Sequence, residues 1–122
     1  MAQTLYERVG GELAVRAVVL RLYRYILDDA ELAFFFKNID IERLKNSQVS
    51  FVSYAFGGPA AYTGKAMRDA HRSSAARGLS DRHFDLVAGY LAQAMRDLGL
   101  ASGMIDEALA TVAATRDDVL NR

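Results

Sequence analysis

The side chains of this sequence best suited to hold a metal are its two histidines, His71 and His83. The chain has no cysteine, which excludes thiolate nucleophiles, disulfides, zinc fingers and iron–sulfur clusters. Two imidazoles are also too few for a metal site that needs several. One imidazole is enough where a porphyrin supplies the other ligands to an iron. The residues therefore permit a single-histidine heme site, although on composition alone a helical protein with two surface or core histidines fits better.

The segment that leads to His71 is unlike the rest of the chain. Three of the nine glycines and the only proline fall between positions 56 and 71. Glycine and proline disfavour helix, so an ordered segment of this composition needs something to hold it. We interpret the segment as presenting His71 to a heme iron, with the surrounding helices forming the pocket.

Other catalytic motifs are absent from the sequence. It contains no Glu-x-x-His, no phosphate loop, no Gly-x-Ser-x-Gly and no His-Glu-x-x-His. Fifteen Lys and Arg balance fifteen Asp and Glu, which gives no electrostatic reason to expect nucleic acid or an anionic membrane as a partner. With 122 residues, 52% of them apolar, the composition predicts one globular domain over residues 1–122. No apolar run is long enough for a membrane span or a signal peptide, so we expect a cytoplasmic protein.

Apolar residues recur at helical spacing through most of the chain, and no segment alternates like a strand. The pattern predicts an all-α fold with long helices at 12–27, 41–55, 81–98 and 103–120, and short ones at 4–9, 31–36 and 65–72. Residues 73–78 read as a loop. Asp40, Ser80 and Ser102 are suited to cap helix starts, and Gly10 and Gly99 to end helices.

Two polar side chains fall on apolar helix faces, Tyr23 in 12–27 and Gln48 in 41–55. A buried amide or hydroxyl without a partner costs on the order of 1–3 kcal/mol. Gln48 could bind a backbone carbonyl and Tyr23 could extend to water. Because there are two of them, we favour a shared polar spot within an apolar pocket.

The sequence resembles the truncated hemoglobins, group 1 in particular, over nearly its whole length. The most specific parts are Gly10-Gly11, Phe35-Phe36, Leu44-Lys45 with Gln48, the segment F-G-G-P-x-x-Y-x-G-x-x-M-x-x-A-H at 56–71, and G-L-S-x-x-H-F-D at 78–85. The resemblance implies a two-over-two helical sandwich around heme b. It also implies that an extended loop replaces most of the helix that carries the proximal histidine.

Carried over by position, the resemblance makes His71 the proximal iron ligand and His83 a residue beside the heme that does not bind iron. Phe36 would pack on the porphyrin. Lys45 and Tyr62 would lie near the propionates. The remaining candidates for the heme wall are Phe51, Met67, Phe84 and Val87.

On the distal side, the resemblance assigns Tyr23 and Gln48 to stabilising a bound ligand, with Leu44 at the distal position. Some cyanobacterial members have a distal histidine where this chain has Ser47, so we expect five-coordinate ferrous iron. Those members can also attach a heme vinyl to a histidine where this chain has Thr115, so we expect heme b to be held non-covalently.

The function implied by the resemblance is reversible binding of O₂, with NO and CO as further diatomic ligands. One alternative is a nitric oxide dioxygenase, which converts NO and O₂ to nitrate and needs a separate reductase because the chain has no flavin segment. A second alternative is a helical interaction module without heme, which the colour of the purified protein distinguishes.

Overall fold

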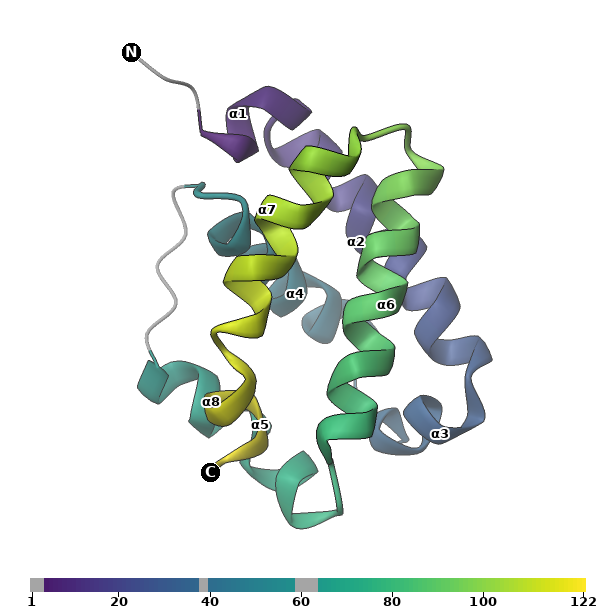
Figure 1. Cartoon of the computed structure of the whole chain (residues 1–122). Coiled ribbons are helices and arrows are strands. Elements are labelled where there is room, and N and C mark those ends of the chain that lie inside the picture. Colours follow the sequence, from purple (N-terminus) through teal and green to yellow (C-terminus); the bar gives the residue numbers. More distant parts are fainter. Residues whose placement is uncertain (1–3, 38–39, 59–63) are drawn as a thin grey trace.

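The computed structural model describes residues 4–37, 40–58 and 64–122, and within these ranges the ordered elements are all helical (Figure 1). The elements are α1 Leu5–Val9, α2 Glu12–Asp28, α3 Ala30–Ala33, the 3₁₀ turn η1 Phe34–Phe36, α4 Ile41–Ala55, α5 Gly64–Ala76, α6 Asp81–Asp97, α7 Ser102–Ala113 and α8 Arg116–Leu120. The all-α prediction is confirmed. None of these helices combines the length and the apolar character that crossing a membrane would require.

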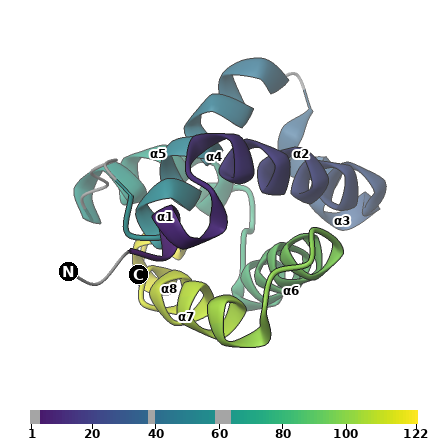
Figure 2. The ribbon, with the colours of Figure 1, turned by 90° about the horizontal axis from the view of Figure 1, so that it is seen from above.

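The four helices α2, α4, α6 and α7 form two layers. Helix α2 packs on α4 and on α6, and α7 packs on α4 and on α6. Seen from above, α2 and α4 lie in one layer and α6 and α7 in the other, which is the two-over-two arrangement (Figure 2). Helix α2 is covered from two sides, and this explains why one wide face of it is buried.

The two faces of α2 follow helical spacing. Val15, Val19, Leu22 and Ile26 recur at three- and four-residue intervals and are at most 2% exposed. Leu27, although apolar, is 42% exposed. It follows Ile26 by one residue, or about 100° around the helix, which turns it away from the buried face.

Helix α5 is longer than predicted. It continues through Ala76, where the sequence suggested a loop from residue 73. Its end is a Schellman turn: the amide of Leu79 donates to the carbonyl of Ser74 (3.0 Å), and Gly78 has a φ of +100°. His71 therefore lies well inside a helix, whereas the predicted helix at 65–72 would end one residue after it.

The predicted helix at 103–120 is two helices. Helix α7 ends at Ala113 and α8 begins at Arg116, with the buried Thr115 between them. The Thr115 hydroxyl donates to the carbonyl of Val112 (2.7 Å), a local bond of the kind that bends or interrupts helices. The predicted cap Ser102 is also wrong by one position, because the N-cap residue is Ala101.

Helix α1 is joined to the end of α4. The amide of Tyr6 donates to the carbonyl of Phe56 (2.6 Å), and the amide of Gly58 donates to that of Ser53 (2.7 Å). A Cβ atom on Gly58 would lie 2.6 Å from the Tyr6 ring and 2.9 Å from the Ser53 carbonyl oxygen. Only glycine fits there without a shift of one of the two helices.

Candidate functional site

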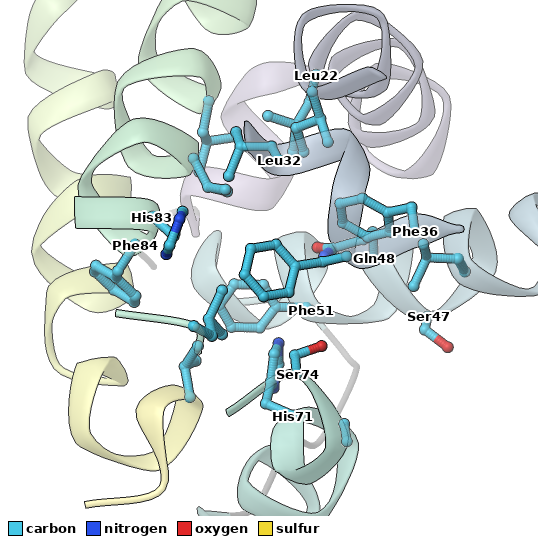
Figure 3. A pocket seen from close by; sticks show the side chains of 18 of the residues that line it. Leu22, Leu32, Phe36, Ser47, Gln48, Phe51, His71, Ser74, His83 and Phe84 are labelled. Atoms are coloured by element: carbon cyan, nitrogen blue, oxygen red, sulfur yellow. The ribbon is translucent and has the colours of Figure 1, made fainter. Parts of the chain in front are cut away.

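A cavity of about 360 Å³ lies between the two layers, and α5 and α8 contribute to its wall (Figure 3). Its lining is mostly aliphatic and aromatic and, among the residues that the structure describes, contains no Asp, Glu, Lys or Arg. The polar side chains on the wall are Ser47, Gln48, His71, Ser73, Ser74 and His83. A cavity with such a wall suits a large apolar ligand with few polar contacts.

Most of the residues predicted for the site line this cavity. These are Phe36, Leu44, Gln48, Phe51, His71, His83, Phe84 and Val87, together with Ser47. They come from η1, α4, α5 and α6, so the structure brings together residues that are as much as 51 positions apart in the sequence.

Three predicted residues lie elsewhere in the described structure. Tyr23 is buried, and its ring stands edge-on to the wall residue Phe36 at a centroid distance of 6.0 Å. Lys45 pairs with Glu42 (3.5 Å). Met67 is buried and contributes its backbone carbonyl to the site. Tyr62 lies outside the described residues.

His71 points into the cavity from α5 (Figure 3). Its Nδ1 lies 2.8 Å from the carbonyl oxygen of Met67, one turn earlier. Since a carbonyl only accepts, Nδ1 carries the proton and Nε2 is left with its lone pair. Burial lowers the pKa of His71, and the bond to Met67 raises it by a smaller amount, so the ring is neutral near pH 7.

His83 also borders the cavity, but its nitrogens face other groups. Its Nδ1 accepts a hydrogen bond from the amide of Ser80 (3.1 Å) and lies 3.0 Å from the Ser80 hydroxyl. Ser80 and His83 together form a capping box at the start of α6. Its Nε2 is 3.7 Å from a carboxylate oxygen of Glu31. The ring also packs edge-on against Phe35, with centroids 4.9 Å apart.

The opposite wall is built largely by α4. Leu44, Gln48 and Phe51 follow one another at helical spacing on the face towards the cavity. The start of this helix is fixed by Asp40, whose carboxylate accepts the amides of Glu42 (3.0 Å) and Arg43 (3.3 Å), as predicted. Gln48 shares this wall of the cavity with Phe36 and Phe51 (Figure 3).

Sequence reasoning missed several wall residues. The aliphatic ones, among them Leu22, Ile26 and Leu32, were assigned to the core or to no particular site. Ser74 also lines the cavity and lies three residues after His71, on the same face of α5. The Schellman signal at Gly78 would have extended the predicted helix and identified Ser74.

The donor set fits a heme. No group of three or more His, Asp or Glu side chains within the described ranges could hold a bare metal ion. A metal in this cavity would therefore have to bring most of its own ligands, as a porphyrin does for iron. One neutral imidazole facing an apolar, uncharged cavity is what such a group requires from the protein.

Comparisons with known proteins give one consistent family. The family model of the bacterial-like globins matches residues 4–121. A group 1 truncated hemoglobin of Tetrahymena pyriformis is 37% identical, over 98% of this chain and 97% of that protein. The group 1 truncated hemoglobin GlbN of a Synechocystis species is 38% identical, over 98% of each.

Solved structures agree with this result. The 2/2 hemoglobin of a Synechococcus species, in the cyanomet state and with covalently attached heme, has a TM-score of 0.90 and 38% identity, and the match covers 98% of this chain and 100% of that one. The truncated hemoglobin of T. pyriformis in the Fe(III) form has a TM-score of 0.86 and 37% identity, with 97% and 98% covered.

Proposed function

This chain belongs to the bacterial-like globin family, as a group 1 truncated hemoglobin with heme b as its cofactor, and from that premise we propose that it binds O₂ reversibly at five-coordinate ferrous iron. Heme b would supply the iron at which the gas binds, and His71 would be the protein ligand that holds it. The observation that carries the proposal is the neutral His71 ring on the cavity wall, with Nδ1 bound to Met67 and Nε2 left for a metal.

We assign the iron ligand to His71. A metal-binding histidine generally donates its other N–H to a carbonyl or carboxylate, which fixes the tautomer and the ring orientation. The carbonyl of Met67 does this for His71 (2.8 Å). His83 instead uses Nδ1 at the start of α6 and faces Glu31 with Nε2, which supports a structural role.

Gln48 and Tyr23 are our candidates for holding the bound ligand. Gln48 is on the wall formed by α4, and Tyr23 is buried one turn from the wall residue Ile26 of α2. An amide N–H and a phenol O–H can each donate to a ligand that gains negative charge. A hydrogen bond of this kind contributes roughly 1.5–3 kcal/mol, which slows ligand release.

Two further residues support the coordination state. Ser47, exposed at the edge of the cavity, has no imidazole with which to occupy the sixth position. Thr115 is buried with its hydroxyl donating to Val112 (2.7 Å), and a hydroxyl in that state is not a nucleophile for a heme vinyl. We therefore propose five-coordinate ferrous iron and non-covalently held heme b.

The test is the rate of O₂ dissociation from the Tyr23→Phe variant, measured by flash photolysis. We expect an increase of more than about tenfold, because losing one charge-assisted hydrogen bond costs about 1.5 kcal/mol or more. Tyr25→Phe is the matched control, since the Tyr25 hydroxyl donates to Asp97 away from the cavity. An unchanged rate for Tyr23→Phe, or equal rates for the two variants, would contradict the distal role.

A second candidate function is nitric oxide dioxygenation. The two proposed donors, Tyr23 and Gln48, favour this activity. Hydrogen bonds from both would slow the release of O₂ and leave time for NO to arrive. NO and O₂ would give nitrate with oxidation of ferrous to ferric iron, so a separate reductase must return one electron. Mixing the oxygenated protein with NO in a stopped-flow instrument distinguishes the two: rapid stoichiometric nitrate supports the dioxygenase, and simple ligand exchange supports O₂ binding alone.

A further inference from the structure

Helix α8 lies between the two helices that carry the cavity histidines. It packs on α5, which carries His71, and on α6, which carries His83 (Figure 1). On the α6 side, the Arg116 guanidinium lies over the ring of the wall residue Phe84 (4.5 Å to the centroid), and ion pairs form at the surface. Arg116 pairs with Asp81 (3.0 Å) and with Asp85 (2.7 Å), both in the first turns of α6.

On the α5 side, α8 binds the backbone as well as a side chain. The Asn121 amide donates to the carbonyl of Arg68 (3.1 Å). In return the Arg68 guanidinium donates to the carbonyl of Arg122 (2.9 Å) and pairs with Asp118 (3.3 Å). Arg68 is thus held through both its carbonyl and its side chain.

The backbone conformation of Asn121 allows its side chain to contact α5. It has a φ of 59° and a ψ of 45°, in the left-handed region that asparagine tolerates better than most residues. Besides Arg68, its amide lies within 3.3 Å of the carbonyl oxygen of Asp118 and 3.5 Å of that of Val119. The amide therefore bridges the end of α8 and one particular carbonyl of α5.

That carbonyl is next to the one that orients His71. The His71 ring bonds to the carbonyl of Met67, and Asn121 bonds to the following carbonyl, that of Arg68. These two carbonyls belong to successive peptide groups of the same turn. Fixing the second restricts the rotation of the first, and with it the direction in which the His71 ring points.

We propose that Asn121 is a positioning residue for His71, setting the orientation of the imidazole towards the heme iron through the Met67–Arg68 turn of α5. The inference rests on the proposed function, because it takes His71 as the iron ligand. The contrasting possibility is that Asn121 only attaches α8, as Asp81 does through its ion pairs with Arg116 and Arg122. The two differ in what each contact reaches: Asp81 binds guanidinium groups at the surface, and Asn121 binds the backbone beside the hydrogen-bond acceptor of the His71 ring.

The experiment compares Asn121→Gly with Asp81→Asn in the heme-loaded protein. Asp81→Asn weakens the surface ion pairs between α6 and α8 and leaves the Arg116 contact with Phe84 in place. Glycine keeps the left-handed conformation and removes the amide. The readouts are the iron–histidine stretching band of the ferrous protein, by resonance Raman, and the rate of hemin transfer to apomyoglobin. We expect Asn121→Gly to shift or broaden the band and to speed hemin loss about threefold, the cost of one modest hydrogen bond. Asp81→Asn should leave the band unchanged, whatever it does to stability.

Asn121→Asp is a second variant, close in shape but without the donor, and should move the band in the same way as Asn121→Gly. An unchanged band in both Asn121 variants would overturn the inference and leave the ligand assignment intact. An equal shift in Asp81→Asn would also overturn it, since the effect would then be general loosening of α8. A wild-type band that survives His71→Gly would instead overturn the ligand assignment itself, and the inference with it.

Discussion

His71 and His83 border the same cavity, yet their surroundings leave them different chemistry. His71 lies in the middle of α5, where its Nδ1 reaches the carbonyl four residues back. His83 is the third residue of α6, where the free amide of the N-cap residue Ser80 is within reach and binds Nδ1. A ring that donates with Nδ1 keeps the Nε2 lone pair for a metal, and a ring that accepts with Nδ1 carries its proton on Nε2.

The comparison teaches that position within a helix decides which nitrogen of a histidine is available. Near a helix start, backbone amides need acceptors and an imidazole can satisfy one. Inside the helix the amides are already bonded, and the ring can only donate to a carbonyl. Side-chain type and exposure alone would not separate the two residues, since both are partly buried on the same wall.

The largest expected effect is that of His71→Ala on heme retention. Loss of a partner of a metal ligand typically costs 10–100-fold in affinity, so loss of the ligand itself should speed hemin loss by more than about 100-fold. Hemin transfer to apomyoglobin and the absorption spectrum of the ferrous protein measure this. Normal heme coordination in His71→Ala would reverse the roles of the two histidines.

The next effect concerns acid stability. Burial, partly opposed by the Met67 hydrogen bond, lowers the pKa of His71 below its ordinary value of 6.5. The unfolded chain therefore binds this proton at a higher pH than the folded chain does. As pH falls below 6.5, stability should decrease until the lowered pKa is reached, with a slope of at most about 1.4 kcal/mol per pH unit.

Urea unfolding of the heme-free chain between pH 7.5 and about 5 measures this slope. His71→Asn should flatten it, and His83→Ala should leave most of it in place. If the slope disappears in His83→Ala and persists in His71→Asn, the buried titrating ring has been assigned to the wrong residue.

A smaller effect is expected for His83→Ala. The variant loses the capping box of α6 and the edge-on contact with Phe35, so unfolding should become easier by about 1–2 kcal/mol. The spectrum of the loaded protein should remain that of wild type. Thermal melts check the loss of stability, and the ferrous spectrum of the same preparation checks the coordination of the heme. A spectrum that shows loss of the iron–histidine bond would contradict the structural role of His83.

The smallest effect is that of Glu31→Gln. Glu31 accepts two hydrogen bonds from Arg82 (3.0 and 2.9 Å) and faces His83, but the Arg82 and Glu31 side chains are exposed. Ion pairs of this kind contribute little, so the change in unfolding free energy should stay within about 0.5 kcal/mol. A larger change would show that Glu31 holds the His83 ring more firmly than Ser80 does.

The sequence predicted the fold best where local signals agree. Helix α4 has the predicted bounds because Asp40 caps its start and the glycines at 57 and 58 follow its end. Helix α6 begins at the predicted residue for a similar reason, with Ser80 before it. Family resemblance then supplied the two-over-two packing, which spacing alone does not determine.

The misplaced boundaries are stabilised in part by interactions that a local pattern does not contain. Helix α5 extends to Ala76, and the next residue, Arg77, donates to the carbonyl of Phe34 (2.8 Å), 43 positions away. The break at Thr115 aims α8 at α5, a direction set by packing rather than by propensity.

The sequence predicted which residues lie at the site better than it predicted how they pack against one another. Sequence spacing placed Leu44, Gln48 and Phe51 on one face, and all three line the cavity. It could not show that the Tyr23 ring would pack edge-on against Phe36, because the two rings come from different elements and meet only on folding. Nor could it show that Met67 contributes its carbonyl rather than its side chain.

Gly58 restricts which sequences are compatible with this fold, although glycine has no side chain that could take part in chemistry. The Tyr6 ring occupies the volume that any side chain at position 58 would need. A lineage that keeps an aromatic residue at 6 must therefore keep glycine at 58, although neither residue contacts the cavity. The substitutions allowed at position 6 and those allowed at position 58 therefore depend on each other, because a Cβ atom at 58 and an aromatic ring at 6 need the same space.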